Sequence, residues 1–394
     1  MAVNSFTFSI MTRLLLLLSL LLPAHRYAIA DEVPSLPLLA AKSYVLLDYT
    51  SNQTLLSHNA DERFEPASLT KLMTAYLTFD ALSHGTLKLE QPVTVPAAAV
   101  STGKPGDESR MLLQTGQTAT VDALLHGLIV QSGNDAAITL AIHIAGSESG
   151  FVDLMNKEAR RLGLSNTRFT NASGFSNPQH YSTANDLAKL SVAILRDYPQ
   201  HYPLFGLREF TFNNFSQANR NRLLWLDPYA DGIKTGRTQQ AGYCLVGSVK
   251  RGERRLISVL LGAESDTLRA SESQKLLNFG FQNFDTVRLY HKEQTVTTAR
   301  LWEGTDRNVP LGFQQDVFLT VPKGQLKQLQ ATLETSQPLL APLSSGQQLG
   351  VMKLTLAGKP FAELPVVALK TVPLANIFSR GWDNIHLLIH KLLQ

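Results

Sequence analysis

The sequence predicts an α+β fold: a domain of antiparallel strands and helices, then a small β-sandwich domain and a terminal amphipathic helix. Three observations indicate this class. Between residues 43 and 285, strand-like and helical runs follow one another without the regular alternation of parallel βαβ units. From about Thr286 onward, short runs of alternating apolar and polar residues stand between turns. Residues 374–394 separate apolar from polar side chains at a helical period.

Residues 1–30 are interpreted as a signal peptide. Arg13 precedes the apolar run Leu14–Leu22, which is too short to span a bilayer, and Ala28 and Ala30 are the small residues that a signal peptidase accepts. Because Arg13 lies far into the segment, residue 11 rather than residue 1 is a candidate for the initiating methionine. We therefore expect an exported chain and exclude residues 1–30 from the fold.

Composition excludes several classes of protein. Lys and Arg number 36 against 32 Asp and Glu, an excess too small to indicate nucleic acid as a partner. Cys244 is the only cysteine, so no internal disulfide can form, and we interpret it as a small buried hydrophobe. No His, Asp or Glu cluster has metal-ligand spacing, so we expect neither metal nor cofactor, and His180 is interpreted as structural.

The first domain is placed at residues 31–285. A strand over Ser43–Asp48 and its hairpin partner Thr54–Leu56 open it, and a helix is expected from Pro66 because proline favours the first helical position. The elements expected after it are a loop over Ser101–Gln117, two helices within Val121–Ile144 with Thr120 as N-cap, a helix over Gly150–Leu164, a loop over Asn171–Asn177, a helix over Ser182–Leu195, a turn over Asp231–Gly236, and strands Gly242–Lys250 and Arg255–Ala263.

The second domain is placed at residues 286–373 and is expected to contain only strands and turns. Its predicted strands are Val287–Tyr290, Gln294–Leu301, Val317–Val321, Leu329–Leu333 and Val351–Leu356.

The last segment, residues 374–394, is interpreted as a helix that lies in a membrane interface. Phe378 and Trp382 stand on its apolar face. It is not expected to span the bilayer, because Arg380 and Asp383 would be desolvated. Docking of the helix on the protein's own core is the alternative.

Two residues inside the helix expected from Pro66 suggest chemistry. Ser68 and Lys71 are three positions apart, so both lie on one helical face. A serine hydroxyl becomes a strong nucleophile when a neighbouring base takes its proton, and a lysine can be that base if its surroundings disfavour the ammonium. Lowering a lysine pKa from about 10.4 to about 7 requires about 4 to 5 kcal/mol. An N-capping serine beside a surface lysine is the alternative.

Two further motifs follow in order, Ser132–Asn134 in the turn between two predicted helices and Lys234–Gly236 at the start of a predicted strand. Together with Ser68–Lys71 they form the signature of penicillin-binding proteins and class A β-lactamases. Over Pro66–Thr74, Ser132–Ala136, Asn219–Trp225 and Asp231–Gly236, the chain resembles the low-molecular-mass, class C penicillin-binding proteins of type 5 (peptidase family S11). These are exported D-alanyl-D-alanine carboxypeptidases. The resemblance extends from about residue 36 to the end.

The resemblance implies a serine β-lactamase/DD-peptidase-like first domain and an acyl-enzyme mechanism. Ser68 would attack the carbonyl between the last two D-alanines of a peptidoglycan stem peptide, and Lys71 would act as general base. Ser132 and Asn134 would hold the substrate amide and the Lys71 ammonium and relay a proton to the leaving amine. The product would be free D-alanine.

The same resemblance implies how the substrate is bound. Lys234 would supply positive charge, Thr235 of the Lys234–Gly236 motif would donate to the terminal carboxylate, and Arg220 would bind that carboxylate with its planar fork. The backbone N–H groups of Ser68 and Arg237 would form the oxyanion hole. Arg237 is a departure, because the family often has histidine there, and this could alter substrate preference.

β-Lactam antibiotics are expected as covalent ligands, and the expected location is the periplasmic face of the bacterial inner membrane. A β-lactamase is one alternative, but the chain has no Glu followed by Leu-Asn between its second and third motifs. A non-catalytic penicillin sensor or peptidoglycan-binding protein is another, although Ser68 and Lys71 are both present.

Overall fold

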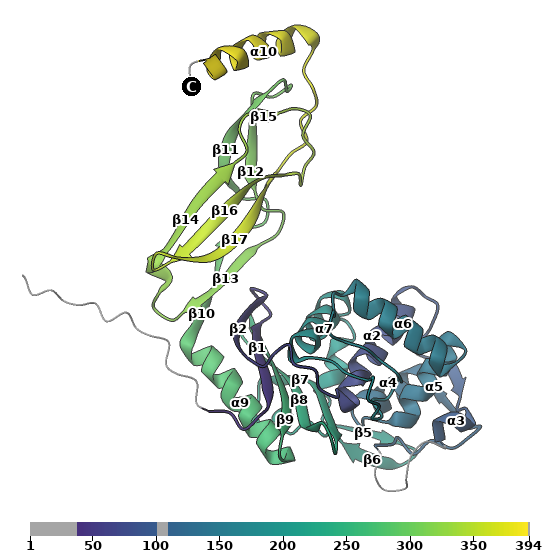
Figure 1. Ribbon diagram of the computed structural model, residues 1–394. Coiled ribbons are helices and arrows are strands. Elements are labelled where there is room, and N and C mark those ends of the chain that lie inside the picture. The colour runs from purple at the N-terminus through teal and green to yellow at the C-terminus, as the bar shows by residue number, and fades with distance from the viewer. Residues whose placement is uncertain (1–37, 101–108, 393–394) are drawn as a thin grey trace, which may run out of the picture. The chain divides into compact units, whose positions relative to one another are not determined.

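The computed structural model describes residues 38–100 and 109–392 (Figure 1). The predicted signal peptide lies outside these residues, as does the first half of the loop predicted over Ser101–Gln117.

The first part of the chain is built on a five-stranded antiparallel sheet with the order β2-β1-β9-β8-β7. Its strands are β1 (Ser43–Asp48), β2 (Gln53–His58), β7 (Ala230–Thr238), β8 (Gly242–Arg251) and β9 (Arg254–Ala263). Both the predicted hairpin and the last two predicted strands are present.

The predicted strand at Lys234–Gly236 is confirmed, because these residues lie on the edge strand β7. The turn predicted before it is wrong, because Asp231 already belongs to β7, and the glycines, which are rare within strands, hid its first residues. The structure gives Gly236 a reason: a Cβ there would lie 2.9 Å from the carbonyl oxygen of Pro66. Glycine lets the strand approach the backbone next to Ser68.

One face of the sheet is covered by helices and short strands that follow β2 in the chain (Figure 1). They are a 3₁₀ turn (Ala67–Thr70), α2 (Lys71–Ser83), β3 (Pro92–Thr94), α3 (Ala97–Val100), β4 (Thr118–Thr120), α4 (Val121–Ile129), α5 (Asn134–Ala145), α6 (Glu148–Arg161), α7 (Ala184–Asp197), a 3₁₀ turn (Tyr202–Gly206), β5 (Glu209–Phe212) and β6 (Phe215–Ala218). The short helix α8 (Leu223–Leu226) packs on the opposite face, where Leu223 joins the hydrophobic cluster of Leu46. As predicted, the Thr120 hydroxyl caps α4 by accepting from the N–H of Ala123.

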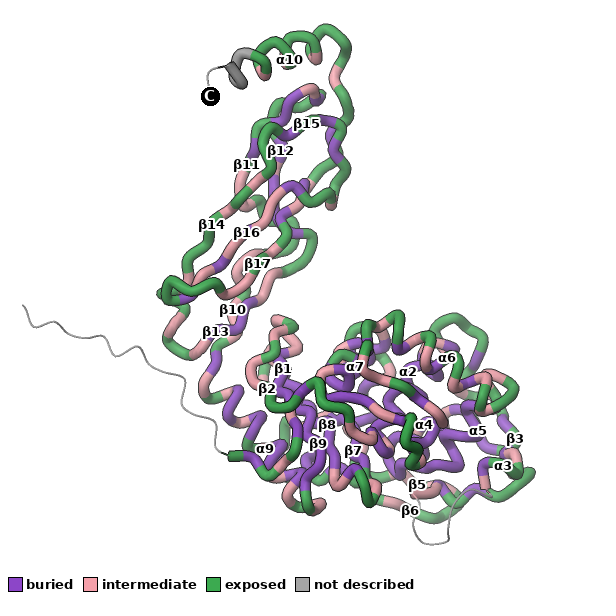
Figure 2. Tube along the Cα trace, in the orientation of Figure 1, coloured by how far each residue is buried: buried purple, intermediate pink, exposed green. Residues whose placement is uncertain are grey.

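The sheet is buried on both faces (Figure 2). Val45 and Leu47 of β1 face the large helical core, whereas Leu46 between them packs with α9 (Asp266–Asn283) on the opposite face. Helix α9 was not predicted. Arg269, Glu272 and other polar residues are buried along it, which breaks the apolar stripe that a sequence reading depends on.

The following part of the chain consists of strands, as predicted. Strand β10 (Phe284–Tyr290) pairs with β13 (Val317–Pro322), and a six-stranded sheet has the order β14-β16-β17-β12-β11-β15. Its members are β11 (Thr295–Trp302), β12 (Asn308–Gly312), β14 (Leu329–Thr335), β15 (Leu339–Leu340), β16 (Gln348–Leu356) and β17 (Lys359–Ala368). Strands β12, β15 and β17 were not predicted, and a 3₁₀ turn over Leu326–Gln328 precedes β14.

The terminal helix α10 (Ile377–Leu392) is present, and five of its apolar side chains are exposed, those of Ile377, Phe378, Trp382, Ile385 and Leu388. Phe378 is 90% exposed and Trp382 62%. Its one hydrogen bond to the β-rich part that the structure gives runs from the Glu303 N–H to Asp383 Oδ2, at 2.7 Å. Among the described residues, no helix is long and apolar enough to cross a membrane.

Candidate active site

Ser68 lies in the 3₁₀ turn Ala67–Thr70, and α2 begins at Lys71. The predicted helix therefore starts with a tighter turn. In a 3₁₀ turn, residues three apart eclipse one another, so the two side chains meet, with 3.1 Å between Lys71 Nζ and Ser68 Oγ. Ala67 has φ +50°, a left-handed conformation that is uncommon outside glycine, and strained residues of this kind cluster at functional sites.

The Lys71 amine is 1% exposed and held by acceptors from two other segments. Asn134 Oδ1 lies 2.7 Å from Nζ, and the carbonyl oxygen of Ser173 lies 2.6 Å from it. In the ammonium form Nζ also donates to Ser68 Oγ. In the neutral form two N–H groups can still serve Asn134 and Ser173, which leaves the lone pair facing the serine hydroxyl. The geometry thus suits a base that takes the proton of Ser68.

The turn Ser132–Asn134 separates α4 from α5 and brings a second hydroxyl to the site. Ser132 Oγ is buried and has no hydrogen-bond partner among the described residues. The turn is fixed from behind, because the Asp135 carboxylate accepts from the N–H groups of Met111 and Leu113 at 2.9 and 3.0 Å. A buried polar atom without a partner is costly and indicates a place for a ligand atom.

Lys234 lies on β7, 3% exposed, with its Nζ donating to the carbonyl oxygen of Thr235 at 3.1 Å. Burial holds the pKa of Lys234 well below its ordinary value, and the charges of Lys71, Arg220 and Arg269 lower it further. Four cations from four separate segments of the chain therefore lie close together here.

A pocket of about 370 Å³ opens beside the nucleophile. The predicted residues that line it are Ser68, Ser132, Arg220, Thr235, Gly236 and Arg237. Lys71 and Asn134 lie beneath Ser68 and are joined to it by the hydrogen bonds above. All nine residues named from the sequence are thus in one place, although they come from four separated segments.

Comparison with known proteins identifies the family. The profile of the family described as D-alanyl-D-alanine carboxypeptidase (peptidase S11) matches residues 30–265, and that of the penicillin-binding protein 5 C-terminal domain matches residues 284–374. The chain belongs to the D-alanyl-D-alanine carboxypeptidase family. The predicted resemblance and the predicted fold class are confirmed.

Three similar proteins illustrate the match. The D-alanyl-D-alanine carboxypeptidase DacC of Escherichia coli is 42% identical over 92% of both chains. The structure of penicillin binding protein 5 from Haemophilus influenzae is 40% identical, covers 86% of this chain and 99% of its own, and superposes with a TM-score of 0.82. Penicillin-Binding Protein D2 from Listeria monocytogenes in its cefotaxime-bound form is 31% identical, covers 62% and 98%, and has a TM-score of 0.58.

Sequence reasoning missed Ser173, which holds Lys71 through its carbonyl oxygen. Every residue has such an oxygen, so no side-chain pattern reveals this contact. The loop that carries it is an Asx turn, in which Asn171 Oδ1 accepts from the N–H groups of Gly174 and Phe175 at 2.7 and 3.0 Å. The abundance of turn residues in this loop was the one available signal.

Sequence reasoning also missed Arg269 of α9, which is 6% exposed. Its guanidinium forms an ion pair with Asp266 and donates to the carbonyl oxygens of Gly236, at 3.1 Å, and Arg220, at 3.4 Å. It therefore ties the end of the Lys234–Gly236 motif to the segment of Arg220. The Asp–Arg pair three residues apart was visible in the sequence, but not its burial.

His180, which was interpreted as structural, is buried, 2% exposed, and contacts the nucleophile turn. Its Nδ1 accepts from the N–H of Thr170 at 3.1 Å, so Nε2 carries the hydrogen and donates to Thr70 Oγ1 at 2.7 Å. Burial lowers the pKa of His180 to about 4, and the charge of Lys71 adds to this effect.

This pKa predicts how stability depends on pH. The unfolded chain protonates His180 near pH 6.5 and the native protein only near pH 4, so between these values the unfolded state binds more protons. We expect this group to cost the native state about 3 kcal/mol as the pH falls from 6.5 to 4. His180→Gln keeps a donor for Thr70 and should flatten the profile, measured by urea unfolding from pH 7.5 to 4. Parallel profiles for the two proteins would contradict the assignment.

Gly174 offers a test of the Ser173 contact. It has φ +92°, and a Cβ there would meet the carbonyl oxygen of Ala67 at 1.9 Å. Gly174→Ala should push the loop off the nucleophile turn and slow the modification of Ser68 by an acylating reagent at least about tenfold, or about 1.4 kcal/mol. Gly163→Ala is the matched control, since Gly163 has φ +69° with nothing within 4 Å. Equal rates in both variants would count against a role for the loop.

Proposed function

We propose that this chain is a serine-type D-Ala-D-Ala carboxypeptidase that removes the terminal D-alanine from peptidoglycan stem pentapeptides. The observation that carries the proposal is the contact of 3.1 Å between Lys71 Nζ and Ser68 Oγ, with Asn134 and Ser173 holding the amine. Membership of the carboxypeptidase family and the identity of about 40% to its named members support it.

In the first step Ser68 Oγ attacks the carbonyl carbon of the penultimate D-alanine as its proton passes to Lys71. The developing oxyanion is met by the backbone N–H groups of Ser68 and Arg237, a type of donor whose loss typically costs about 3 to 4 kcal/mol in the barrier. The peptide bond then breaks. Ser132, whose hydroxyl has no partner among the described residues, relays a proton to the departing amine, and free D-alanine leaves.

In the second step water attacks the ester of the acyl-enzyme, and Ser68 is regenerated with its proton. The substrate is held for both steps by its terminal carboxylate, which receives the Thr235 hydroxyl and the Arg220 guanidinium. Lys234 contributes positive charge. No metal or cofactor is needed for these steps, and among the described residues no three His, Cys, Asp or Glu side chains group in a way that could hold a metal ion.

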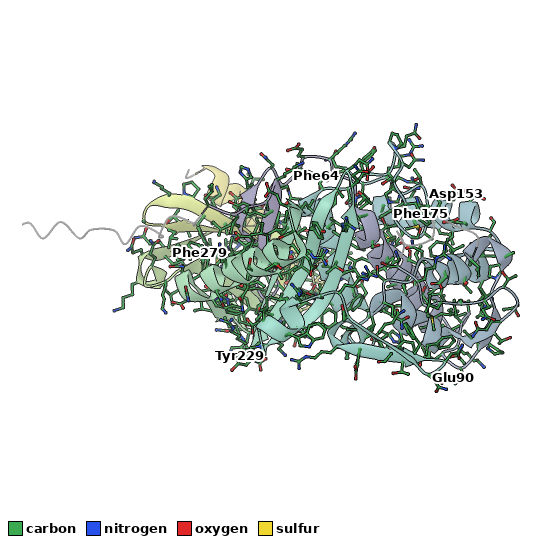
Figure 3. All side chains as sticks on the ribbon, turned by 90° about the horizontal axis from the view of Figure 1, so that it is seen from below. Phe64, Glu90, Asp153, Phe175, Tyr229 and Phe279 are labelled. Carbon is green, nitrogen blue, oxygen red and sulfur yellow. The ribbon has the colours of Figure 1, made fainter. Side chains whose placement is uncertain are left out.

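β-Lactam antibiotics would acylate Ser68 in the same way, because their strained amide presents the same carbonyl. The cefotaxime-bound structure of the Listeria monocytogenes protein supports this for a relative. A β-lactamase would also need an acid that activates water near Ser68. None of the Asp or Glu residues between the second and third motifs lines the pocket beside Ser68. One of them, Asp153, lies at the outer edge of the molecule (Figure 3).

We propose the domain limits predicted above, with residues 1–30 as an export signal, 31–285 as the peptidase domain, 286–373 as the β-rich domain and 374–394 as a membrane anchor. The family profiles match residues 30–265 and 284–374, which supports the limits of the peptidase domain and of the β-rich domain. The exposed Phe378 and Trp382 support an anchor that lies in the plane of an interface. The protein would then work at the periplasmic face of the bacterial inner membrane.

D-Alanine release tests the activity. The mature protein should release D-alanine from a pentapeptide ending in D-Ala-D-Ala and become stably labelled by a fluorescent penicillin. Ser68→Ala should abolish both, at least about 1,000-fold in rate, because the acyl-enzyme cannot form. Rapid turnover of the penicillin without release of D-alanine would indicate a β-lactamase, and a stable label without release would indicate a sensor.

Partition onto vesicles tests the anchor. The protein lacking residues 374–394 should stay in solution with vesicles of mixed zwitterionic and anionic lipid, whereas the full mature chain should bind them. Trp382→Ser should weaken binding about tenfold or more, because an interfacial aromatic is lost. Asn384→Ser, on the polar face, is the control. Unchanged binding after the deletion would refute the anchor.

A further inference from the structure

The pocket beside Ser68 has an unbalanced charge. Four arginines line it, Arg220, Arg222, Arg237 and Arg269, and Asp266 is the one acid among the described lining residues. That carboxylate is already shared, because it pairs with Arg222 at 3.2 Å and with Arg269.

The remaining two guanidiniums, of Arg220 and Arg237, have no carboxylate partner within ion-pair distance among the described residues. Partial enclosure lowers the pKa of Arg220, and Arg237 lowers it further while Asp266 opposes the shift. The two cations therefore repel each other across the pocket. An anion placed between them would remove that repulsion.

The side chain of Arg237 is directed into the pocket by its strand. Thr235 and Arg237 are two residues apart on β7, so they share a face, and both line the pocket. Arg237 is paired across the sheet with Tyr243, and its guanidinium lies 5.1 Å from the centre of that ring. Such a contact holds the cation over the aromatic face and leaves its N–H groups free to donate.

Resting on the proposed function, we propose that Arg237 is a specificity-determining residue whose guanidinium binds a carboxylate of the substrate beside Arg220. The carboxylate belongs either to the terminal D-alanine or to a residue further up the stem peptide. In both cases the chain selects its substrate by charge, and the side chain of Arg237 acts independently of its backbone N–H.

Three peptides separate the two sources. The first ends in D-Ala-D-Ala with a free terminal carboxylate and a free side-chain carboxylate upstream. The second has a terminal carboxamide, and the third has the upstream carboxylate amidated. The binding constant of each is measured by how far it slows the acylation of Ser68 by a fluorescent penicillin, so that substrates and non-substrates are compared in one assay.

The full mature chain is compared with Arg237→Gln, Arg237→Lys and Arg222→Gln. Arg237→Gln should weaken the first peptide about tenfold while kcat for D-alanine release stays within about threefold. Arg237→Gln should not change the binding constant of the peptide that lacks the carboxylate that Arg237 binds. Arg237→Lys should lie between, because a lysine keeps the charge but not the fork. Arg222→Gln is the matched control on the same rim and should change binding less than about twofold.

If Arg237→Gln no longer distinguishes the first peptide from the second, Arg237 binds the terminal carboxylate. If it no longer distinguishes the first peptide from the third, Arg237 binds the upstream carboxylate. The proposal is overturned if Arg237→Gln leaves all three constants unchanged, weakens all three equally, or behaves as Arg222→Gln does. Failure of the proposed function is a separate result, in which the unaltered protein neither releases D-alanine nor is labelled.

Discussion

The buried amine of Lys71 is the constraint on which the site depends. An amine that is 1% exposed must find acceptors inside the protein, because an unpaired buried polar group is costly. Its acceptors come from the turn before α5 and from the loop after α6, while Ser68 precedes it in its own turn. Three segments far apart in the sequence must therefore be in place before Lys71 can face Ser68.

The close approach of β7 to the nucleophile turn follows from the same demand. Gly236 and Gly174 each lie where a Cβ would strike the backbone of Pro66 or Ala67. The turn that carries Ser68 is thus enclosed by backbone on two sides, which holds its left-handed Ala67 in place. Contacts between main-chain segments therefore help to fix the nucleophile, in addition to the side-chain contact of His180 with Thr70.

The sequence was sufficient for residues whose side chains act within short patterns. Ser68, Lys71, Ser132, Asn134 and Lys234 were found in this way, and the structure brings them together. Contacts made by the backbone could not be predicted, because every residue has a carbonyl oxygen and no sequence pattern marks that of Ser173. The burial of Arg269 could not be predicted either, because an arginine is usually exposed and its acceptors, the carbonyl oxygens of Gly236 and Arg220, are distant in the sequence.

The same distinction applies to the fold. Strands β8 and β9 and helices α4 to α7 have a clear apolar period and were predicted. Only the part of strand β7 at Lys234–Gly236 was predicted, because its glycines serve close contacts rather than strand formation. Helix α9 was not, because tertiary partners stabilise its buried polar residues. Local sequence patterns therefore did not predict those elements whose structure depends on contacts with distant segments of the chain.

The single thiol of the chain lies inside this arrangement. Cys244 is fully buried on β8, directly opposite Gly236, and burial raises the pKa of its thiol to about 11. The thiolate, not the thiol, is the nucleophile that attacks a thiol reagent, so the native protein is protected twice, by the burial of Cys244 and by its protonation. Modification of Cys244 therefore requires a local opening of the core that covers it. The rate at which a thiol reagent modifies Cys244 therefore measures how often the five-stranded sheet opens locally around this residue.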